Sequence, residues 1–298
     1  MVTMSENISI QLNNQQQNEL IQKYQNSAIA SKNQYVRFCA KVDAVTINLY
    51  TSGKVVFQGV NANALATPFL NPQLKKESNP SPKIISTVLP QAGSDEVGTG
   101  DVFGPIVVVA SYVDETIYEQ LQPYNINDSK QLSDDWISEV APKLMNIVPY
   151  ASLILDNKKY NDVHQQYNLN ALKAILHNSA YAHLQTKIKQ LPKLCVVDQF
   201  TPENSYYRYL KNQSPIISNL TFQTKAESSF ISVAISSMIA RYLFLQAMDQ
   251  LSTQVGFTLH KGAGKQVDED INRLINEKGK AILPYVTKCH FSNIKKKL

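Results

Sequence analysis

Apolar and polar residues alternate along two neighbouring segments in the first third of the chain. Within residues 36–42, and again within 45–50, every second position is apolar and the positions between them are mostly polar. A period of two is typical of strands with one buried and one open face. Residues 54–58 predict a third strand, preceded by a turn at Ser52 and Gly53. Together these segments predict a small antiparallel sheet.

A helix is predicted before these strands. Apolar residues recur at helical spacing from Leu20 to Ala28, which predicts one amphipathic helix ending at about Ala30. Residues 1–18 are rich in Asn and Gln and are expected to fray at the start of the chain. Residues 1–70 are therefore expected to form a small domain that combines a helix with an antiparallel sheet.

A proline-rich segment, residues 71–92, separates this domain from a different pattern. Its prolines are interspersed with Ser and Asn, which is the composition of a linker. In residues 93–298 strand-like and helix-like patterns alternate, which predicts an α/β domain. The helix predicted at 227–251 is apolar nearly all round, so we expect it to be central. The other strands are predicted at 106–112, 151–156, 194–198 and 216–223, and the other helices at 169–190 and 267–278.

The net charge of +5 is concentrated in the first third of the chain. Residues 1–93 carry 8 Lys and Arg against 4 Asp and Glu, whereas residues 94–298 carry 21 against 20. This distribution favours a basic appendage attracted to phosphates, joined to a domain whose acids are available for a metal. A mildly basic soluble protein without such a role has the same net charge, so charge alone does not decide.

The chain shows no pattern of a membrane span or of a secretion signal. No uninterrupted apolar run approaches the about 20 residues that cross a bilayer, and residues 1–17 lack the apolar core of a signal peptide. The cysteines, Cys39, Cys195 and Cys289, are odd in number and have no zinc spacing. We therefore expect reduced thiols, a cytoplasmic location and no membrane association.

The candidate chemistry begins at Asp95 and Glu96, two adjacent acids that directly precede the glycine-rich turn at residues 98–100. Carboxylates bind hard divalent cations, and glycines let the backbone approach a ligand closely. Adjacent residues of a strand point to opposite faces. The two acids can therefore share a metal only if the chain bulges or turns there, which the glycines make plausible.

Two further acids stand out by their context. Asp198 ends the short apolar run 194–198, and Glu227 opens the predicted central helix. Each has a purely structural alternative, because a strand-terminal Asp often caps a turn and a Glu in the first turn of a helix is favoured by the helix dipole. Four acids gathered at one point would repel one another unless cations neutralised them. No cluster of His or Cys stands out in the sequence, so this oxygen-only set predicts Mg²⁺ or Mn²⁺ rather than zinc.

These segments occur in the order of a known family. The sequence resembles the type 2 ribonucleases H, and two features are typical of ribonuclease HIII. The shared motifs are Ser-Asp-Glu-Val-Gly-Thr-Gly-Asp at 94–101, Asn-Asp-Ser-Lys-Gln-Leu-Ser at 127–133, Val-Val-Asp-Gln-Phe at 196–200 and Thr-Lys-Ala-Glu-Ser at 224–228. The features typical of ribonuclease HIII are Tyr-Asn-Leu-Asn-Ala-Leu-Lys-Ala at 167–174 and Tyr-Thr-Ser-Gly-Lys-Val-Val-Phe-Gln-Gly at 50–59.

The resemblance implies a ribonuclease H-like catalytic domain at 93–298 and an N-terminal α+β domain similar to half of a TATA-binding protein. It implies that two metal ions are held by the four acids, which would also be the catalytic residues. The fourth acid is glutamate here, as in ribonuclease HIII, where ribonuclease HII has aspartate. By motif the four are Asp95, Glu96, Asp198 and Glu227.

The resemblance also implies residues that contact the substrate. The backbone of the glycine-rich turn would contact the ribonucleotide strand, one lysine the substrate phosphates, and the open sheet face of the small domain the duplex. The residues of the turn are Gly98, Thr99 and Gly100, and the lysine is Lys130. The candidates on the open sheet face are Arg37, Lys41 and Tyr50. The stretch that contains this lysine also has a structural alternative, because Ser133, three residues further on, could cap a following helix.

On this basis we expect an endonuclease that hydrolyses the RNA strand of RNA–DNA hybrids and leaves 5′-phosphate and 3′-hydroxyl ends. We expect it to act as a monomer without an obligatory protein partner. Two alternatives stay open: incision at single ribonucleotides embedded in DNA, as in ribonuclease HII, and a non-catalytic protein that binds hybrids.

Overall fold

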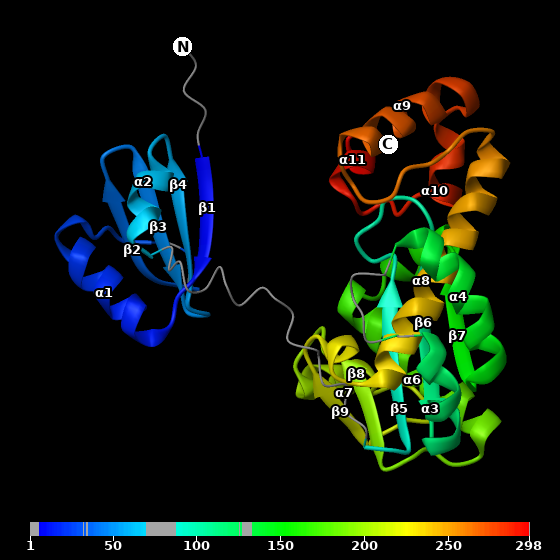
Figure 1. Cartoon of the computed structure of the whole chain (residues 1–298). Coiled ribbons are helices and arrows are strands. Elements are labelled where there is room, and N and C mark those ends of the chain that lie inside the picture. The colour runs from blue at the N-terminus through cyan, green and yellow to red at the C-terminus, as the bar shows by residue number, and fades with distance from the viewer. Residues whose placement is uncertain are drawn as a thin grey trace. The chain divides into compact units, whose positions relative to one another are not determined.

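The computed structural model describes residues 6–31, 33, 35–69, 88–124, 126 and 133–297. The chain divides into two compact units, Met1–Ser81 and Pro82–Leu298 (Figure 1). Each unit has its own hydrophobic core. The proline-rich segment predicted as a linker, residues 71–92, lies mostly outside the described residues, but its predicted end is wrong, because Gln91 and Ala92 already pair within the larger sheet.

The N-terminal unit is built on a four-stranded antiparallel sheet with the order β1-β4-β3-β2. The three predicted strands are confirmed, and a fourth that was not predicted lies within the Asn- and Gln-rich residues 1–18, of which the first five are outside the described residues. Residues 6–11 form an edge strand whose Ile8 and Ile10 pair with Phe57 and Val55. The strands are β1 Glu6–Gln11, β2 Val36–Val42, β3 Val45–Tyr50 and β4 Lys54–Gly59.

Helices cover one face of this sheet. Helix α1 spans Asn14–Tyr24, earlier than predicted, because Asn13 and Gln16 form a capping box at its start. A short helix, α2, spans Ala62–Ala66. Leu20 from α1 packs with alternate residues of the strands in a core whose members are buried. The opposite face of the sheet carries the polar members of the alternation.

The C-terminal unit is built on a five-stranded sheet with the order β7-β6-β5-β8-β9. Strands β5, β6 and β7 pair antiparallel, whereas β8 and β9 run parallel to β5. The predicted strand at 216–223 is shorter than expected, because only its last four residues join the sheet. The strands are β5 Gln91–Val97, β6 Ile106–Val113, β7 Tyr150–Leu155, β8 Leu194–Asp198 and β9 Leu220–Gln223.

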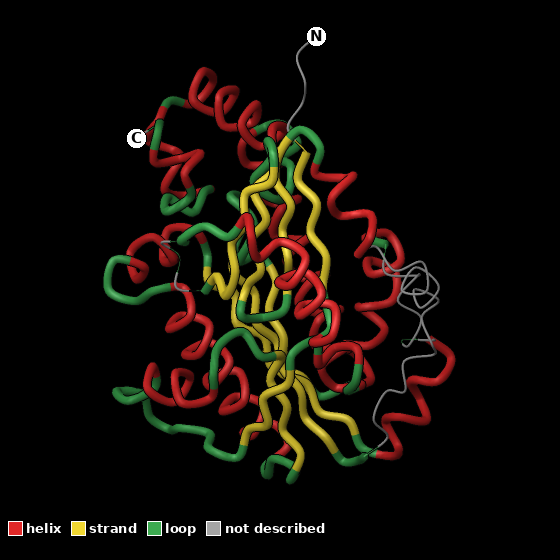
Figure 2. The backbone as a smooth tube through the Cα atoms, turned by 90° about the vertical axis from the view of Figure 1, so that its left-hand side faces the viewer, coloured by secondary structure: helices red, strands yellow, loops and turns green. Residues whose placement is uncertain are grey.

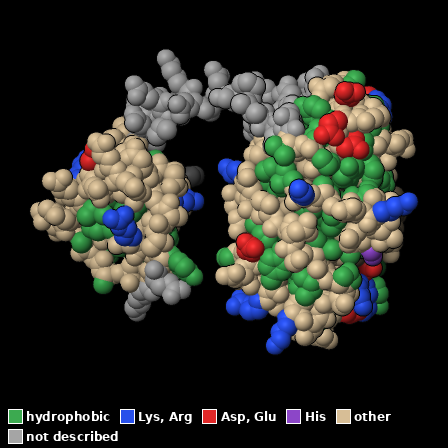
Figure 3. Space-filling view, turned by 90° about the horizontal axis from the view of Figure 1, so that it is seen from below, with side chains coloured by type: hydrophobic (Ala, Val, Ile, Leu, Met, Phe, Trp, Pro, Cys, Tyr) green, Lys and Arg blue, Asp and Glu red, His purple; other side chains and the backbone are tan. Residues whose placement is uncertain are grey.

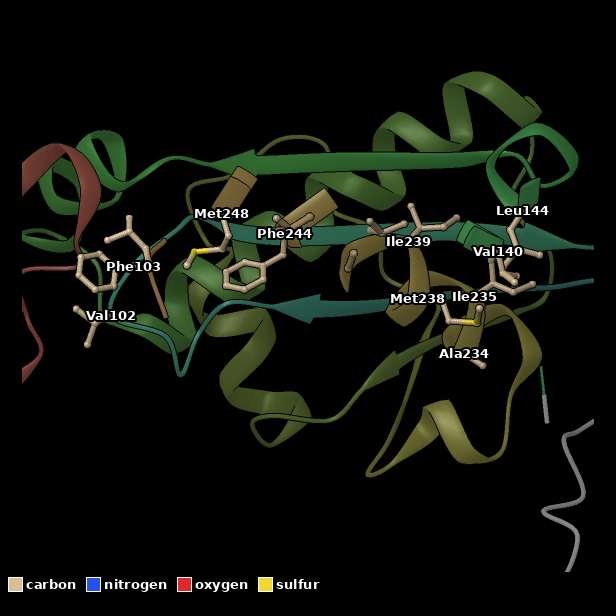
Figure 4. Packing of buried hydrophobic residues seen from close by; sticks show 14 of the residues in the cluster. Val102, Phe103, Val140, Leu144, Ala234, Ile235, Met238, Ile239, Phe244 and Met248 are labelled. Atoms are coloured by element: carbon tan, nitrogen blue, oxygen red, sulfur yellow. The ribbon is translucent and has the colours of Figure 1, made fainter. Parts of the chain in front are cut away.

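Two long helices pack on opposite faces of the larger sheet. Helix α8, Ile231–Val255, packs with the residues of β6 that face one side, and α6, Leu169–Ile188, packs with those that face the other. Figure 2 shows helices on both sides of the strands, and Figure 4 shows part of the core around α8. Helix α8 approaches β5 closely, because a Cβ atom added to Gly93 would lie 2.5 Å from the Val233 nitrogen. The two faces of the sheet therefore meet different helices.

Helix α8 is central, as its composition predicts. It begins at Ile231, after a 3₁₀ turn at 226–228, rather than at Glu227. By length and hydropathy alone it could cross a membrane, although Arg241 and Asp249 interrupt its apolar residues. However, 61% of its most apolar window is buried inside the unit, which is typical of a core helix.

Shorter helices complete the C-terminal unit. Helices α9 to α11 belong to the last part of the chain and pack on the core around α8 through Ile271, Leu283 and Ile294. The remaining helices are α3 Glu115–Leu121, α4 Asp134–Ile147, α5 Asn157–His164, α7 Glu203–Tyr209, α9 Lys265–Lys278, α10 Leu283–Val286 and α11 Ser292–Lys295.

Candidate active site

Asp95 and Glu96 lie near the end of β5 and point to opposite faces of the sheet. The register with β6 is regular through both residues, since Asp95 pairs with Val109 and Glu96 with Val108. The bulge or turn that the two acids would need in order to share a metal is therefore absent at these two residues. Asp95 faces α8, where the Ser237 hydroxyl donates a hydrogen bond to it. Glu96 faces α6.

Asp198 lies beside Asp95 at the carboxyl end of the neighbouring parallel strand. Ser94 pairs with Val197 across β5 and β8, so the next residue of each strand is an aspartate on the α8 face. Oδ1 of Asp198 accepts a hydrogen bond from the Ala226 N–H at 2.9 Å. This bond holds the 3₁₀ turn that carries Glu227 next to the strand ends. The fold thus brings three of the four predicted acids to one edge of the sheet.

The electrostatics of Asp95 show that negative charge is concentrated here. Burial, the charge of Glu96 and, to a smaller extent, the charge of Asp198 together raise the pKa of Asp95 from 3.8 to about 7. Hydrogen bonds from the Ser237 hydroxyl and from the Glu96 N–H, the latter at 2.7 Å, act in the opposite direction. A divalent cation would relieve this repulsion.

Replacing Asp95 with Asn is expected to stabilise the fold in the presence of a chelator. Because the pKa of Asp95 is higher in the folded chain, the stability that its protonated form contributes is lost as the pH rises from about 4 to 7. Asn does not ionise, so Asp95→Asn should be about 2–4 kcal/mol more stable than the parent at about pH 8. Urea unfolding with chelator measures this difference, and equal stability of the two proteins would contradict it.

Glu96 is held by two basic side chains of α6 that the sequence analysis did not identify. Lys173 forms an ion pair with its Oε1, and Nε2 of His177 lies 2.8 Å from its Oε2. Burial alone would raise the pKa of Glu96, but His177 and Lys173 lower it below its usual range. The other ring nitrogen of His177 lies 2.7 Å from the Ser94 hydroxyl. The one available signal was a lysine and a histidine four residues apart within a largely apolar helix.

The glycine-rich turn directly follows β5. Gly98 is buried and has a φ of 95°, whereas Thr99 is half-buried and Gly100 is exposed. Beyond the turn, the Asp101 carboxylate accepts a hydrogen bond of 2.6 Å from the Gly262 N–H. The exposed residue of the turn, Gly100, is therefore five residues from Asp95 and is followed directly by a residue that is hydrogen-bonded to Gly262.

The predicted contact residues of the N-terminal unit differ in their placement. Lys41 and Tyr50 lie on the open face of the sheet, opposite the helices. Arg37 lies at a bulge of β2, and its guanidinium donates a hydrogen bond of 3.0 Å to Gln17 of α1. Its side chain is thus engaged with the helix, against the prediction that it points outward from the sheet. Lys130 lies outside the described residues.

The donor set at the edge of the large sheet fits a hard divalent cation. Asp95, Glu96, Asp198 and Glu227 offer only carboxylate oxygens, which suit Mg²⁺ or Mn²⁺. Over the part of the chain that the structure describes, no three acidic, His or Cys side chains are close enough to form a preassembled metal cluster. Glu96 faces the other side of the sheet, so the acids do not form a ready-made cluster. The case for a divalent cation therefore rests on the carboxylate ligands and on the electrostatic repulsion at Asp95.

The fold and the acidic residues at the edge of the large sheet together define the class of protein. A mixed sheet with aspartates at the ends of neighbouring parallel strands is the ribonuclease H-like arrangement of a metal-dependent nuclease. The family model for Ribonuclease HII matches residues 92–294, and a model described as a domain of unknown function (DUF3378) matches residues 7–82.

Known relatives specify the family further. The chain is 42% identical to Ribonuclease HIII of Bacillus cereus, over 99% of this chain and 99% of the relative. It is 39% identical to Ribonuclease HIII of Lactococcus lactis, over 97% of both chains. The crystal structure of Bst-RNase HIII in complex with Mn²⁺ superimposes with a TM-score of 0.68 at 38% identity, covering 98% of this chain and 97% of that one. The chain belongs to the ribonuclease HIII family, whose members are hydrolases of the endoribonuclease class.

Proposed function

We propose that this protein hydrolyses the RNA strand of RNA–DNA hybrids and leaves 5′-phosphate and 3′-hydroxyl ends. The observation that carries the proposal is the pair of aspartates, Asp95 and Asp198, side by side at the carboxyl ends of β5 and β8. Their mutual repulsion contributes to the raised pKa of Asp95. Family membership supports the reaction class.

The acids of this edge would hold two ions of Mg²⁺ or Mn²⁺. When bound, such ions activate the attacking water and neutralise charge on the scissile phosphate. By motif, Asp95 and Asp198 would orient the ions from adjacent strands, and Glu227 would add a donor from the neighbouring turn. Glu96 would complete the set only if its carboxylate left Lys173 and His177 on the other face of the sheet. Lys173 and His177 fix the Glu96 carboxylate from the α6 side. The Mn²⁺ complex of Bst-RNase HIII supports this assignment.

The N-terminal unit is proposed as the substrate-binding domain, with the proline-rich segment that precedes β5 as its linker. Its open sheet face carries Lys41 and Tyr50, and its surface shows more basic than acidic side chains in the view of Figure 3. Phosphate contacts of this kind give affinity without sequence preference. An added binding domain suits a long hybrid better than a single ribonucleotide, so it favours the hybrid as substrate. We also propose that the protein acts in the cytoplasm as a monomer.

Two labelled duplexes test the proposal: a continuous RNA–DNA hybrid, and DNA that carries one ribonucleotide. With Mg²⁺ or Mn²⁺ we expect cutting of the hybrid in its RNA strand, no cutting with chelator, and little cutting of the second duplex. Phosphatase treatment of the labelled products identifies their ends. Efficient cutting at the single ribonucleotide would instead indicate ribonuclease HII-like specificity. Binding of the hybrid with no metal-dependent cutting would indicate a non-catalytic protein.

A further inference from the structure

Lys288 is a completely buried lysine that lies outside the acid edge. It follows α10, and its ammonium donates hydrogen bonds to three main-chain carbonyls, those of Asp101 at 2.8 Å, Phe103 at 3.5 Å and Gly104. An ammonium group has three donors and no acceptor. Each of its protons therefore has a carbonyl partner on one short segment, residues 101–104.

The same segment is fixed by other parts of the chain that are distant in sequence. The Lys288 N–H donates to the Val102 carbonyl at 2.8 Å, and Phe103 forms a β-bridge with Thr287. The Val102 N–H donates to the Gly262 carbonyl at 2.9 Å. Side chains of Val102 and Phe103 are also anchored in the core around α8 (Figure 4). The main chain directly after the glycine-rich turn is thus held from several directions.

Burial of the Lys288 ammonium beside this segment is energetically unfavourable. Burial lowers the pKa of Lys288 to about 7, although the charge of Asp101 acts in the opposite direction. An apolar side chain of similar length would avoid this cost but would remove the Lys288 donor from the Asp101 and Phe103 carbonyls. The Gly104 carbonyl would keep a hydrogen bond of 2.9 Å from the Asn157 side chain. What Lys288 contributes in return is a fixed main-chain conformation of residues 101–104. Because residues 101–104 follow the turn directly, their position constrains Thr99 and Gly100, the two residues of the turn that are not buried.

We propose that Lys288 is a positioning residue for substrate recognition: it holds residues 101–104 so that the turn at 98–100 meets the ribose of the RNA strand. The inference rests on the proposed function, because it needs an RNA–DNA hybrid as the substrate. Lys288 itself touches neither the substrate nor the acids. Its contribution is to the conformation of the turn, through the carbonyls that it holds.

The variant Lys288→Met tests this role, with Lys280→Met as the matched control, since Lys280 is exposed in the same part of the chain. In Lys288→Met we expect the KM for the hybrid to rise about tenfold or more, because loss of a positioned contact weakens substrate binding, while kcat changes less than about threefold. Mn²⁺ binding measured by calorimetry should stay at the parental value, since the acids lie on other elements. Lys280→Met should match the parent in all three quantities.

Chemical rescue tests whether the ammonium group of Lys288, rather than the volume of its side chain, sets the KM. Lys288→Ala keeps the Cβ atom, so propylammonium supplies the missing atoms, and it should restore the KM at least in part. Propanol, which lacks the charge, should not. If Lys288→Met does not fold, the rescue of Lys288→Ala decides alone. A parental KM in Lys288→Met, or a raised KM in Lys288→Ala that propylammonium does not lower, would overturn the inference. Absence of hybrid cleavage by the parent protein would instead overturn the proposed function.

Discussion

Asp95→Asn is expected to lower the rate of hybrid cleavage by about a thousandfold or more, while the affinity for the hybrid stays within about threefold of the parent. Asn has the shape of Asp and can still accept the hydrogen bonds from Ser237 and from the Glu96 N–H. It lacks the negative charge that a divalent cation requires beside Asp198. Hybrid affinity rests largely on phosphate contacts, which this change leaves in place.

Single-turnover cleavage and equilibrium binding of the same labelled hybrid measure the two quantities. The matched control is Asp156→Asn, because Asp156 also lies at the end of a strand, directly after β7. Its exposed side chain caps α5, a role that Asn fills equally well. This control should cleave at the parental rate. Cleavage by Asp95→Asn at a comparable rate would remove Asp95 from the mechanism, and loss of hybrid binding would show that its carboxylate serves the fold.

The elements with strong periodicity could be predicted from the sequence, and those without it could not. The alternation in β2 and β3 and the continuous apolar runs of β6 and β8 specify strands, because one or both of their faces are buried. Strand β1 was missed since Asn, Ser and Gln flank its two isoleucines, and only pairing with β4 makes it a strand. Tertiary contacts decided where local propensity was weak.

The acids of the site could be predicted by motif, but their surroundings could not. Sequence order does not reveal that Asp95 and Glu96 remain in a regular strand and face different helices. Nor does it reveal that Lys173 and His177 hold Glu96. These contacts join residues about 80 positions apart, which only the packing of α6 on β5 brings together. A motif identifies which residues are present, whereas the sheet determines the side to which each one points.

Gly98→Ala is expected to destabilise the protein by about 3 kcal/mol or more and to abolish cleavage. The φ of Gly98 is 95°, a conformation that L residues rarely adopt. A Cβ atom there would lie 2.1 Å from the Pro105 carbonyl oxygen and 3.0 Å from the ring of Phe244. The first of these is backbone next to the start of β6, so it cannot move aside without disturbing the sheet. The strain would thus arise at Gly98, which lies in the sequence between the acid Asp95 and residues 101–104, the segment bound by Lys288.

Gly100→Ala is the matched control for this prediction, because it adds the same methyl group two residues further along the turn. A Cβ atom at Gly100 has no neighbour within 4 Å, and the residue does not have a positive φ. Its unfolding free energy should stay within about 0.5 kcal/mol of the parent. Urea unfolding of both variants makes the comparison. Equal stability of Gly98→Ala and Gly100→Ala would show that the turn can relax around a side chain. The close approach of Gly98 to Pro105 would then not be what fixes the position of the turn beside the acids.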